Sequence, residues 1–204
     1  MNDEFRIKSL ADLQEVISDP HPRIQKKVCT QLDDHSIDFI ARSPLVCLGT
    51  SNAAGELDVS PKGDAPGFVR VLDAHTLVIP ERPGNHLAMG FRNLLENDRI
   101  GVFFLIPGVK ESFRVNGQAT LSRDPELLEA ASVNGKPAVL CTIVTVEECF
   151  FHCGKALIRS KLWQADSWPS NRQSNMVQQL SEVIGVEEKA LKESIESSYE
   201  NNLY

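Results

Sequence analysis

Apolar and polar positions alternate with period two through the middle of the chain, which predicts short β-strands. Phe113, Val115, Ala119 and Leu121 alternate with polar residues, so one face of this strand is apolar and the other is polar. The segment 99–106 is apolar almost throughout, which is typical of a strand buried on both faces. Similar patterns and turn residues predict the other strands, at residues 45–50, 57–60, 68–72, 76–79 and 139–153.

Helical spacing is confined to stretches outside these strands. Leu10, Leu13 and Val16 fall on one face of an expected N-terminal helix. The other expected helices include residues 37–40, 86–96, 176–184, which Gly185 ends, and 187–199. Because only the helix at 86–96 lies between strands, the order of elements favours a mainly β, α+β architecture built on an antiparallel barrel over a parallel α/β sheet.

Length and composition narrow the class of protein. The 204 residues, 42% of them hydrophobic, suit one domain with a sizeable core. No apolar run approaches the ~20 residues that span a bilayer, and the first residues lack the order of a signal peptide, so we expect no membrane association. Five cysteines do not form a disulfide framework, which favours a cytoplasmic location. A net charge of −7 disfavours nucleic-acid binding.

A loop before the expected helix at 86–96 is a candidate anion site. Asn85 is a suitable N-cap, and the free N–H groups of a helix start attract a phosphate. Arg82 and His86 would add positive charge. The alternative is that Gly84 and Asn85 only turn and cap the chain while Arg82 is solvated.

Residues 60–67 form a second candidate, because proline and glycine interrupt strand pairing there. Backbone groups freed in this way can hydrogen-bond a flat heterocycle. The alternative is a plain surface loop.

Two cations and an indole form a third candidate. Lys155, Arg159 and Trp163 are spaced by four residues, so a helix would project them on one face as a clamp for an anion and a ring. The alternative is a solvated basic face with Trp163 in the core.

Metal and nucleophile chemistry find less support. Cys149, His152 and Cys153 lack a second pair of ligands at a zinc-site spacing, so no metal is expected. Cys153 and His152 are adjacent in an expected strand and therefore point to opposite faces. Glycine-rich phosphate-binding and dinucleotide-binding motifs and the serine-hydrolase motif are absent from the sequence.

Taken together, several segments resemble the pyridoxamine 5′-phosphate oxidase-related family of FMN-binding split β-barrel proteins, in its probable FMN-dependent branch. The resemblance extends over most of the chain from about Asp34. It is carried by residues 60–73, 82–85, 97–108, 113–119, 152–163 and 202–204.

This resemblance implies an antiparallel split β-barrel with flanking N- and C-terminal helices. The barrel would occupy residues 45–163, after a helical lead-in at 1–44 and before a helical tail at 164–204 that packs on the same domain. It also implies a homodimer with FMN at the subunit interface, where both subunits line each site.

The resemblance assigns site residues by position. The strand-end loop at residues 60–64 would line the flavin ring, with Ser60, Pro61, Lys62 and Gly63 as its site residues. The segment 80–86 would lie along the ribityl chain and phosphate, with Pro80, Glu81, Arg82, Asn85 and His86 as its site residues. Arg114 would come from the partner subunit. The oxidases proper carry an Arg-Lys pair where Asn85 and His86 stand, so the phosphate charge would be met by Arg82, by Lys62 or by the face of Lys155, Arg159 and Trp163.

The function implied is that of an FMN-dependent oxidoreductase acting on a small-molecule substrate. The substrate segment of the oxidases has no match at 187–204, so vitamin B6 oxidation is not implied, and no catalytic residue is assigned. Two alternatives stay open. One is a non-catalytic flavin-binding or storage protein, and the other is a barrel that binds haem or a deazaflavin, with His152 as the haem candidate.

Overall fold

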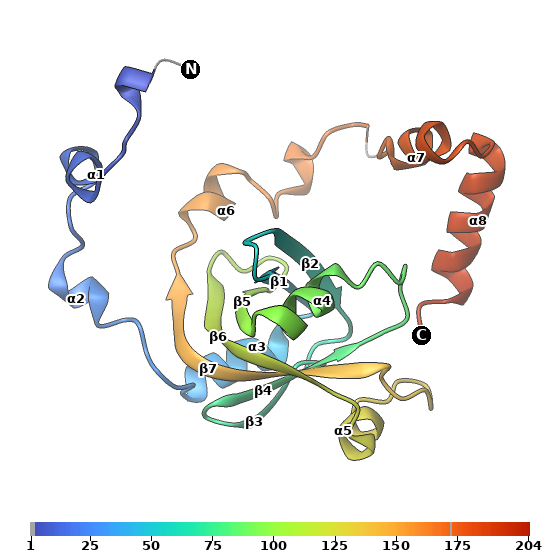
Figure 1. Cartoon of the computed structure of the whole chain (residues 1–204), viewed down its shortest axis with the longest axis horizontal. Coiled ribbons are helices and arrows are strands. Elements are labelled where there is room, and N and C mark those ends of the chain that lie inside the picture. Colours follow the sequence, from blue (N-terminus) through green and yellow to red (C-terminus); the bar gives the residue numbers. More distant parts are fainter. Residues whose placement is uncertain (1–2, 172) are drawn as a thin grey trace.

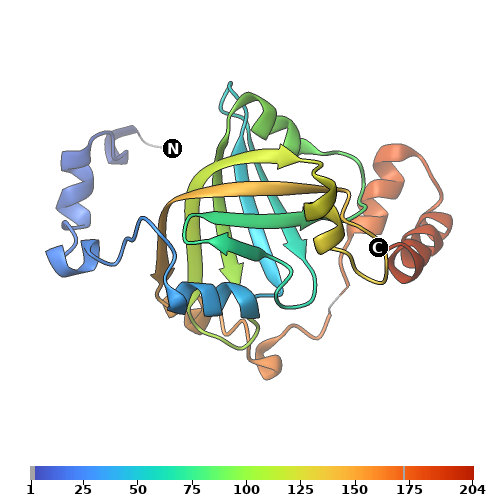
Figure 2. The same cartoon turned by 90° about the horizontal axis from the view of Figure 1, so that it is seen from below.

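The centre of the molecule is one curved, entirely antiparallel sheet of seven strands, which wraps into a barrel (Figures 1 and 2). The computed structural model describes residues 3–171 and 173–204. The strand order is β2-β1-β5-β6-β7-β4-β3. The strands are β1 (Leu45–Ser51), β2 (Leu57–Gly63), β3 (Arg70–Asp73), β4 (Thr76–Glu81), β5 (Arg99–Leu105), β6 (Ser112–Ser122) and β7 (Leu140–His152). The predicted split-barrel fold with flanking helices is confirmed.

Two strand predictions need correction. β2 continues through Pro61 to Gly63 in register with β1, so proline does not interrupt the pairing as expected. Pro61 is tolerated because β2 is an edge strand, whose outer side needs no N–H donors. β5 is not buried on both faces: Ile100, Val102 and Phe104 face the core, whereas the alternate residues stay half-buried or exposed.

A β-bulge in β7 keeps both halves of this long strand facing the core. Asn116 of β6 pairs with Glu148 and Gly117 with Val146, so Glu147 is the extra residue. Before the bulge Val144 and Val146 are buried, and after it Cys149 is buried. A Cβ on Gly117 would overlap the carbonyl oxygen of Thr145, so glycine permits this close strand approach.

The main core fills the inside of the barrel and is closed by helix α3 (Asp34–Arg42), which contributes Phe39 and Ile40. The side chain of Asp33 accepts the Ser36 N–H at 2.8 Å, and the Asp33 N–H donates to the Ser36 hydroxyl, which fixes the start of α3. A smaller core lies under α5 (Pro125–Ala130), around Val78 and Cys141. The helix α5 lies between strands and was not predicted from the sequence.

Both ends of the chain project from opposite sides of the barrel (Figures 1 and 2). The N-terminal arm carries a 3-10 turn (Asp3–Phe5), α1 (Leu10–Val16) and α2 (Pro22–Gln25), in which no residue is buried. An isolated antiparallel β-bridge, made by the backbones of Cys29 and Cys149, joins the arm to β7. Met1 and Asn2 of the expected lead-in, and position 172 of the expected tail, lie outside the described residues.

The C-terminal part follows β7. It contains α6 (Lys155–Arg159), a 3-10 turn (Ala165–Ser167), α7 (Met176–Ile184) and α8 (Glu188–Asn201). The tail helices and the stop at Gly185, which has a positive φ of 70°, agree with the sequence prediction. None of the helices in the described part of the chain is long and apolar enough to cross a membrane.

Candidate functional site

A cavity of about 530 Å³ opens between β2, helix α4 (Met89–Glu96) and the loop that joins β4 to α4. This volume lies within the range of about 300–1,000 Å³ that is usual for ligand sites. Seven of the residues singled out from the sequence line it, although they come from two segments: Ser60, Pro61, Lys62, Glu81, Arg82, Asn85 and His86.

The loop between β4 and α4 forms one wall, but not in the predicted way. Helix α4 begins at Met89, and its N-cap is Ala88, which makes no side-chain cap. The Asn85 side chain instead accepts the N–H of Leu87 at 3.1 Å, and His86 and Ala88 take left-handed φ values of 61° and 53°. The expectation that Asn85 caps the helix is therefore wrong, because its local turn competes with helix formation.

Lys62 on β2 reaches across the cavity wall to β4. Its Nζ lies 2.8 Å from Oε2 of Glu81. The same ammonium lies 4.8 Å from the ring centroid of Phe91 on α4. Since both side chains of the ion pair are largely buried, Lys62 and Glu81 tie β2 to β4 beside the cavity.

Arg82 makes a second, more buried ion pair. Its Nε donates a hydrogen bond to Oδ2 of Asp64 at 2.9 Å, Nη2 lies 2.8 Å from the same oxygen, and the Asp64 side chain is only 3% exposed. Burial works to raise the pKa of Asp64, but hydrogen bonds from Ala65, Tyr204 and Arg82 hold it below its ordinary value. Asp64 is therefore a carboxylate at neutral pH.

The two ion pairs, Lys62 with Glu81 and Arg82 with Asp64, mark the polar end of the cavity and determine what it can bind. Each cation already has a carboxylate partner, so the polar end carries little net charge. A guanidinium has five N–H groups, and Asp64 accepts the one on Nε while Nη2 lies beside the same oxygen. Within the described residues, the two N–H groups of Nη1 of Arg82 make no hydrogen bond and suit an anionic oxygen.

Six of the predicted site residues do not line this cavity. Gly63 lies one residue beyond Lys62 in β2, and Pro80 is buried in β4 opposite Cys141. Arg114 lies on β6 outside the core, stacked against Phe103 and Phe150. The other three are Lys155, Arg159 and Trp163, which follow β7.

The predicted clamp of two cations and an indole on one helix is not formed. Helix α6 ends at Arg159, and Lys161 takes a left-handed φ of 52°. Trp163 therefore lies beyond the helix, where its indole N–H donates to the carbonyl oxygen of Val109 at 2.8 Å. Regular four-residue spacing did not reveal that the helix stops after five residues.

The model of the family described as pyridoxamine 5′-phosphate oxidase matches residues 32–153. The chain belongs to this family. The matched range includes every residue that lines the cavity, from Leu48 to Leu140, and leaves the N-terminal arm and the C-terminal tail outside. The resemblance inferred from the sequence is thereby confirmed.

Solved structures give further similarities. HupZ of Group A Streptococcus is 19% identical with a TM-score of 0.48, over 59% of this chain and 93% of its own. An FMN-binding protein from Syntrophomonas wolfei is 11% identical with a TM-score of 0.43, over 56% and 84%. General Stress Protein 26 from Bacillus anthracis is 12% identical with a TM-score of 0.44, over 56% and 88%. No curated protein matches the sequence.

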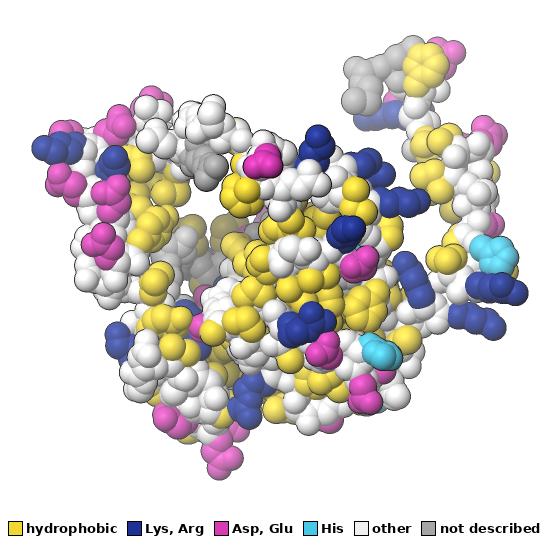
Figure 3. Space-filling model, turned by 180° about the vertical axis from the view of Figure 1, so that it is seen from behind, with side chains coloured by type: hydrophobic (Ala, Val, Ile, Leu, Met, Phe, Trp, Pro, Cys, Tyr) yellow, Lys and Arg dark blue, Asp and Glu magenta, His cyan; other side chains and the backbone are white. Residues whose placement is uncertain are grey.

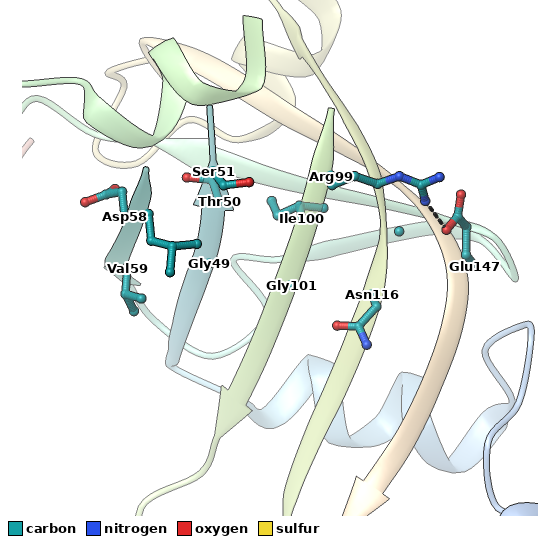
Figure 4. A pocket seen from close by; sticks show the side chains of 12 residues that line it. Gly49, Thr50, Ser51, Asp58, Val59, Arg99, Ile100, Gly101, Asn116 and Glu147 are labelled. Atoms are coloured by element: carbon teal, nitrogen blue, oxygen red, sulfur yellow. Dashed lines mark hydrogen bonds and ion pairs between the residues drawn. The ribbon is translucent and has the colours of Figure 1, made fainter. Parts of the chain in front are cut away.

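A second hollow, of about 330 Å³, lies on the outside of the barrel and was missed by sequence reasoning (Figure 4). It forms where Gly49 of β1 lies opposite Gly101 of β5, since neither residue fills the surface with a side chain. Asn116 borders it, and the ion pair of Arg99 with Glu147 closes one side (Figure 4). Two glycines that lie opposite each other on neighbouring strands indicate a hollow in the sheet surface, but the sequence does not show that Gly49 and Gly101 are opposite until the strand register is known.

The cysteines and His152 show no metal centre. All five cysteines are free thiols. Within residues 3–171 and 173–204, no group of three or more His, Cys, Asp or Glu side chains could hold a metal ion. Burial lowers the pKa of His152, and Arg114 and Lys27 lower it further by repulsion.

Proposed function

We propose that this member of the pyridoxamine 5′-phosphate oxidase family is an FMN-dependent oxidoreductase that acts on a small molecule. The observation that carries the proposal is the cavity, in which the segments around Lys62 and Arg82 meet although they are twenty residues apart. When bound, FMN supplies two-electron redox chemistry, and the protein contributes binding, orientation and shielding from water.

The residues present fit such a cofactor. Arg82 offers free N–H groups to a phosphate, while Asp64 fixes its guanidinium from the other side. Leu48, Leu94 and Leu140 give the cavity apolar walls suited to a ring system. Lys62 stands at the cavity wall with its charge shared by Glu81, where it would orient polar edges of the ring.

The proposal includes a homodimer, with the partner subunit completing each site. On the outer face of the barrel, Leu57 and Val59 of the edge strand β2 are 80% and 70% exposed. Phe103 of β5 continues this apolar surface. Hydrophobic side chains also gather across the barrel in the view of Figure 3. An identical chain would cover such a surface and bring Arg114, Lys155 or Arg159 toward the neighbouring cavity.

Purification tests the cofactor directly. A yellow protein with flavin absorbance, in which anaerobic addition of a substrate from a library of small molecules bleaches the flavin, supports the oxidoreductase. Flavin absorbance that no library member bleaches favours a storage protein. A haem Soret band or a bound deazaflavin would contradict FMN as the cofactor.

A double substitution tests whether Arg82 holds the phosphate. Arg82→Gln alone would leave Asp64 buried without its cation, so Arg82→Gln is combined with Asp64→Asn. Loss of a charge-assisted contact should weaken FMN by about 1.5–3 kcal/mol, or about tenfold to a hundredfold, with riboflavin little affected. Fluorescence titration of apoprotein with both flavins measures the difference.

Arg92→Gln is the matched control, because Arg92 lies on the exposed side of the neighbouring helix α4 and does not line the cavity. It should leave both flavins unchanged. Equal losses of FMN and riboflavin in the double variant would place Arg82 away from the phosphate.

A further inference from the structure

The C-terminal tail returns to the barrel beside the cavity. Helices α7 and α8 pack on each other and contain no buried residue. After α8 the chain turns back, and Figures 1 and 2 both show its C-terminal end next to the loop between β4 and α4. Tyr204 is half-buried there, in contrast to the three exposed residues before it.

Three contacts hold Tyr204 in place. Its hydroxyl donates to Oδ1 of Asp64 at 2.9 Å. Its ring lies under the Arg82 guanidinium, with 5.6 Å between the guanidinium carbon and the ring centroid. Its main-chain oxygen accepts a hydrogen bond from Nζ of Lys136 at 2.8 Å.

The two carboxylate oxygens of Asp64 therefore have separate partners. Oδ2 accepts the Nε–H of Arg82 and lies beside its Nη2, whereas Oδ1 accepts the Tyr204 hydroxyl and the N–H of Ala65. We propose that Tyr204 is a positioning residue, which holds Asp64 and Arg82 so that the free edge of the guanidinium faces a phosphate group in the cavity. This inference rests on the proposed function, because the phosphate is that of FMN.

The charge on Asp64 determines how the Tyr204 hydroxyl affects phosphate binding by Arg82. The hydrogen bond to Asp64 raises the pKa of Tyr204, so the hydroxyl keeps its proton and remains a donor at neutral pH. That donor takes up part of the negative charge of Asp64. Without it, the carboxylate would draw the Arg82 guanidinium more strongly to itself and leave it less able to bind a phosphate.

Tyr204→Phe tests the positioning role, because phenylalanine keeps the ring under Arg82 and loses only the hydroxyl. Tyr199→Phe is the matched control: it makes the same chemical change on α8, at a side chain that is 61% exposed. We expect Tyr204→Phe to weaken FMN about fivefold, at the lower end of couplings between protein sites, and to leave riboflavin binding unchanged. In the Arg82→Gln, Asp64→Asn background the same change should have no effect on FMN.

An equal loss of both flavins, or no loss of either, would overturn the positioning role. If the wild-type protein binds neither flavin, the proposed function fails, and titration with inorganic pyrophosphate then decides the role of Tyr204. Weaker pyrophosphate binding by Tyr204→Phe than by the wild type and Tyr199→Phe would support the role. Equal binding, or none in the wild type, would overturn it.

Discussion

Individual side chains in this protein take their chemical character from their immediate neighbours more than from their type. Asp64 and Glu81 are both carboxylates paired with a cation, but only Asp64 is nearly inaccessible and receives donors on both oxygens. The backbones of Cys149 and Cys29 pair in a β-bridge, and both side chains are free thiols. Cys149 is 2% exposed, whereas Cys29 is at the surface. Reactivity should separate these two thiols.

Burial raises the pKa of Cys149 to about 11, with nearby Cys29, Asp33 and Glu148 acting in the same direction. A raised thiol pKa keeps the sulfur protonated, so at pH 8 about one molecule in a thousand carries the Cys149 thiolate. Iodoacetamide at pH 8 should therefore label exposed Cys29 and Cys153 and leave Cys149 unmodified, as read by peptide mass spectrometry.

Denaturant supplies the control for this experiment, because all five thiols should then react. Native labelling of Cys149 as fast as that of Cys29 would show that β7 opens readily where the arm joins it.

At the scale of elements, the same capping device has different consequences in two helices. α1 and α3 each begin with a capping box, formed by Ser9 with Asp12 and by Asp33 with Ser36. α3 packs Phe39 into the core, whereas α1 buries nothing. A cap therefore contributes to global stability only where its helix is part of the cooperative unit.

Asp33→Ala should lower the free energy of unfolding by about 1 kcal/mol, the usual cost of a lost N-cap. Ser9→Ala removes the equivalent cap from α1 and should leave the unfolding transition unchanged, because α1 buries no residue. Urea denaturation followed by circular dichroism measures both. A similar loss in the two variants would mean that α1 unfolds together with the barrel.

Elements with local signals were predictable, and those fixed by distant contacts were not. The apolar face of β6 follows from strict alternation over residues 113–121. The bulge at Glu147 shifts the alternation in β7, so its inward face could not be read from periodicity. The start of α4 was misplaced because Asn85 forms a local turn whose chemistry resembles that of a cap.

The site divides in the same way. Local motifs identified Lys62 and Arg82, and the fold brings both to one cavity. The contacts that hold Arg82 could not be deduced from the sequence, because Asp64 and Tyr204 are 140 residues apart and meet only through the tertiary fold. For a role of the tail in the site, the sequence offered one signal, which was the resemblance to the family at residues 202–204.

At the scale of the whole molecule, much apolar surface lies on parts that the barrel does not cover. In the N-terminal arm Phe5, Leu10 and Val16 are 80%, 69% and 73% exposed. On the outer face of the barrel, Leu57 is equally open. Since monomeric proteins rarely leave large contiguous apolar patches exposed, these surfaces fit the proposed association with a second copy.

We expect light scattering to give twice the chain mass of 22.6 kDa for the wild-type protein. Leu57→Asp should shift the mass to that of a monomer, because burying an unpaired carboxylate in an interface is costly. Leu72→Asp is the matched control, since Leu72 is 49% exposed on β3, the edge strand at the other end of the sheet. A monomeric wild type would exclude the two-subunit site.

The single extra residue in β7 also limits how this barrel can change in length during evolution. Val146 and Cys149 both face the core only because Glu147 resets the alternation between them. A regular strand with Glu147 still present would turn the whole second half of β7, including the β-bridge to Cys29, to the wrong face, whereas loss of Glu147 itself would leave a regular strand that keeps Val146 and Cys149 inward. A change of one residue in β7 should therefore survive where it deletes the bulged residue Glu147, or where a compensating bulge arises in the same strand, and other insertions and deletions should come in steps of two residues.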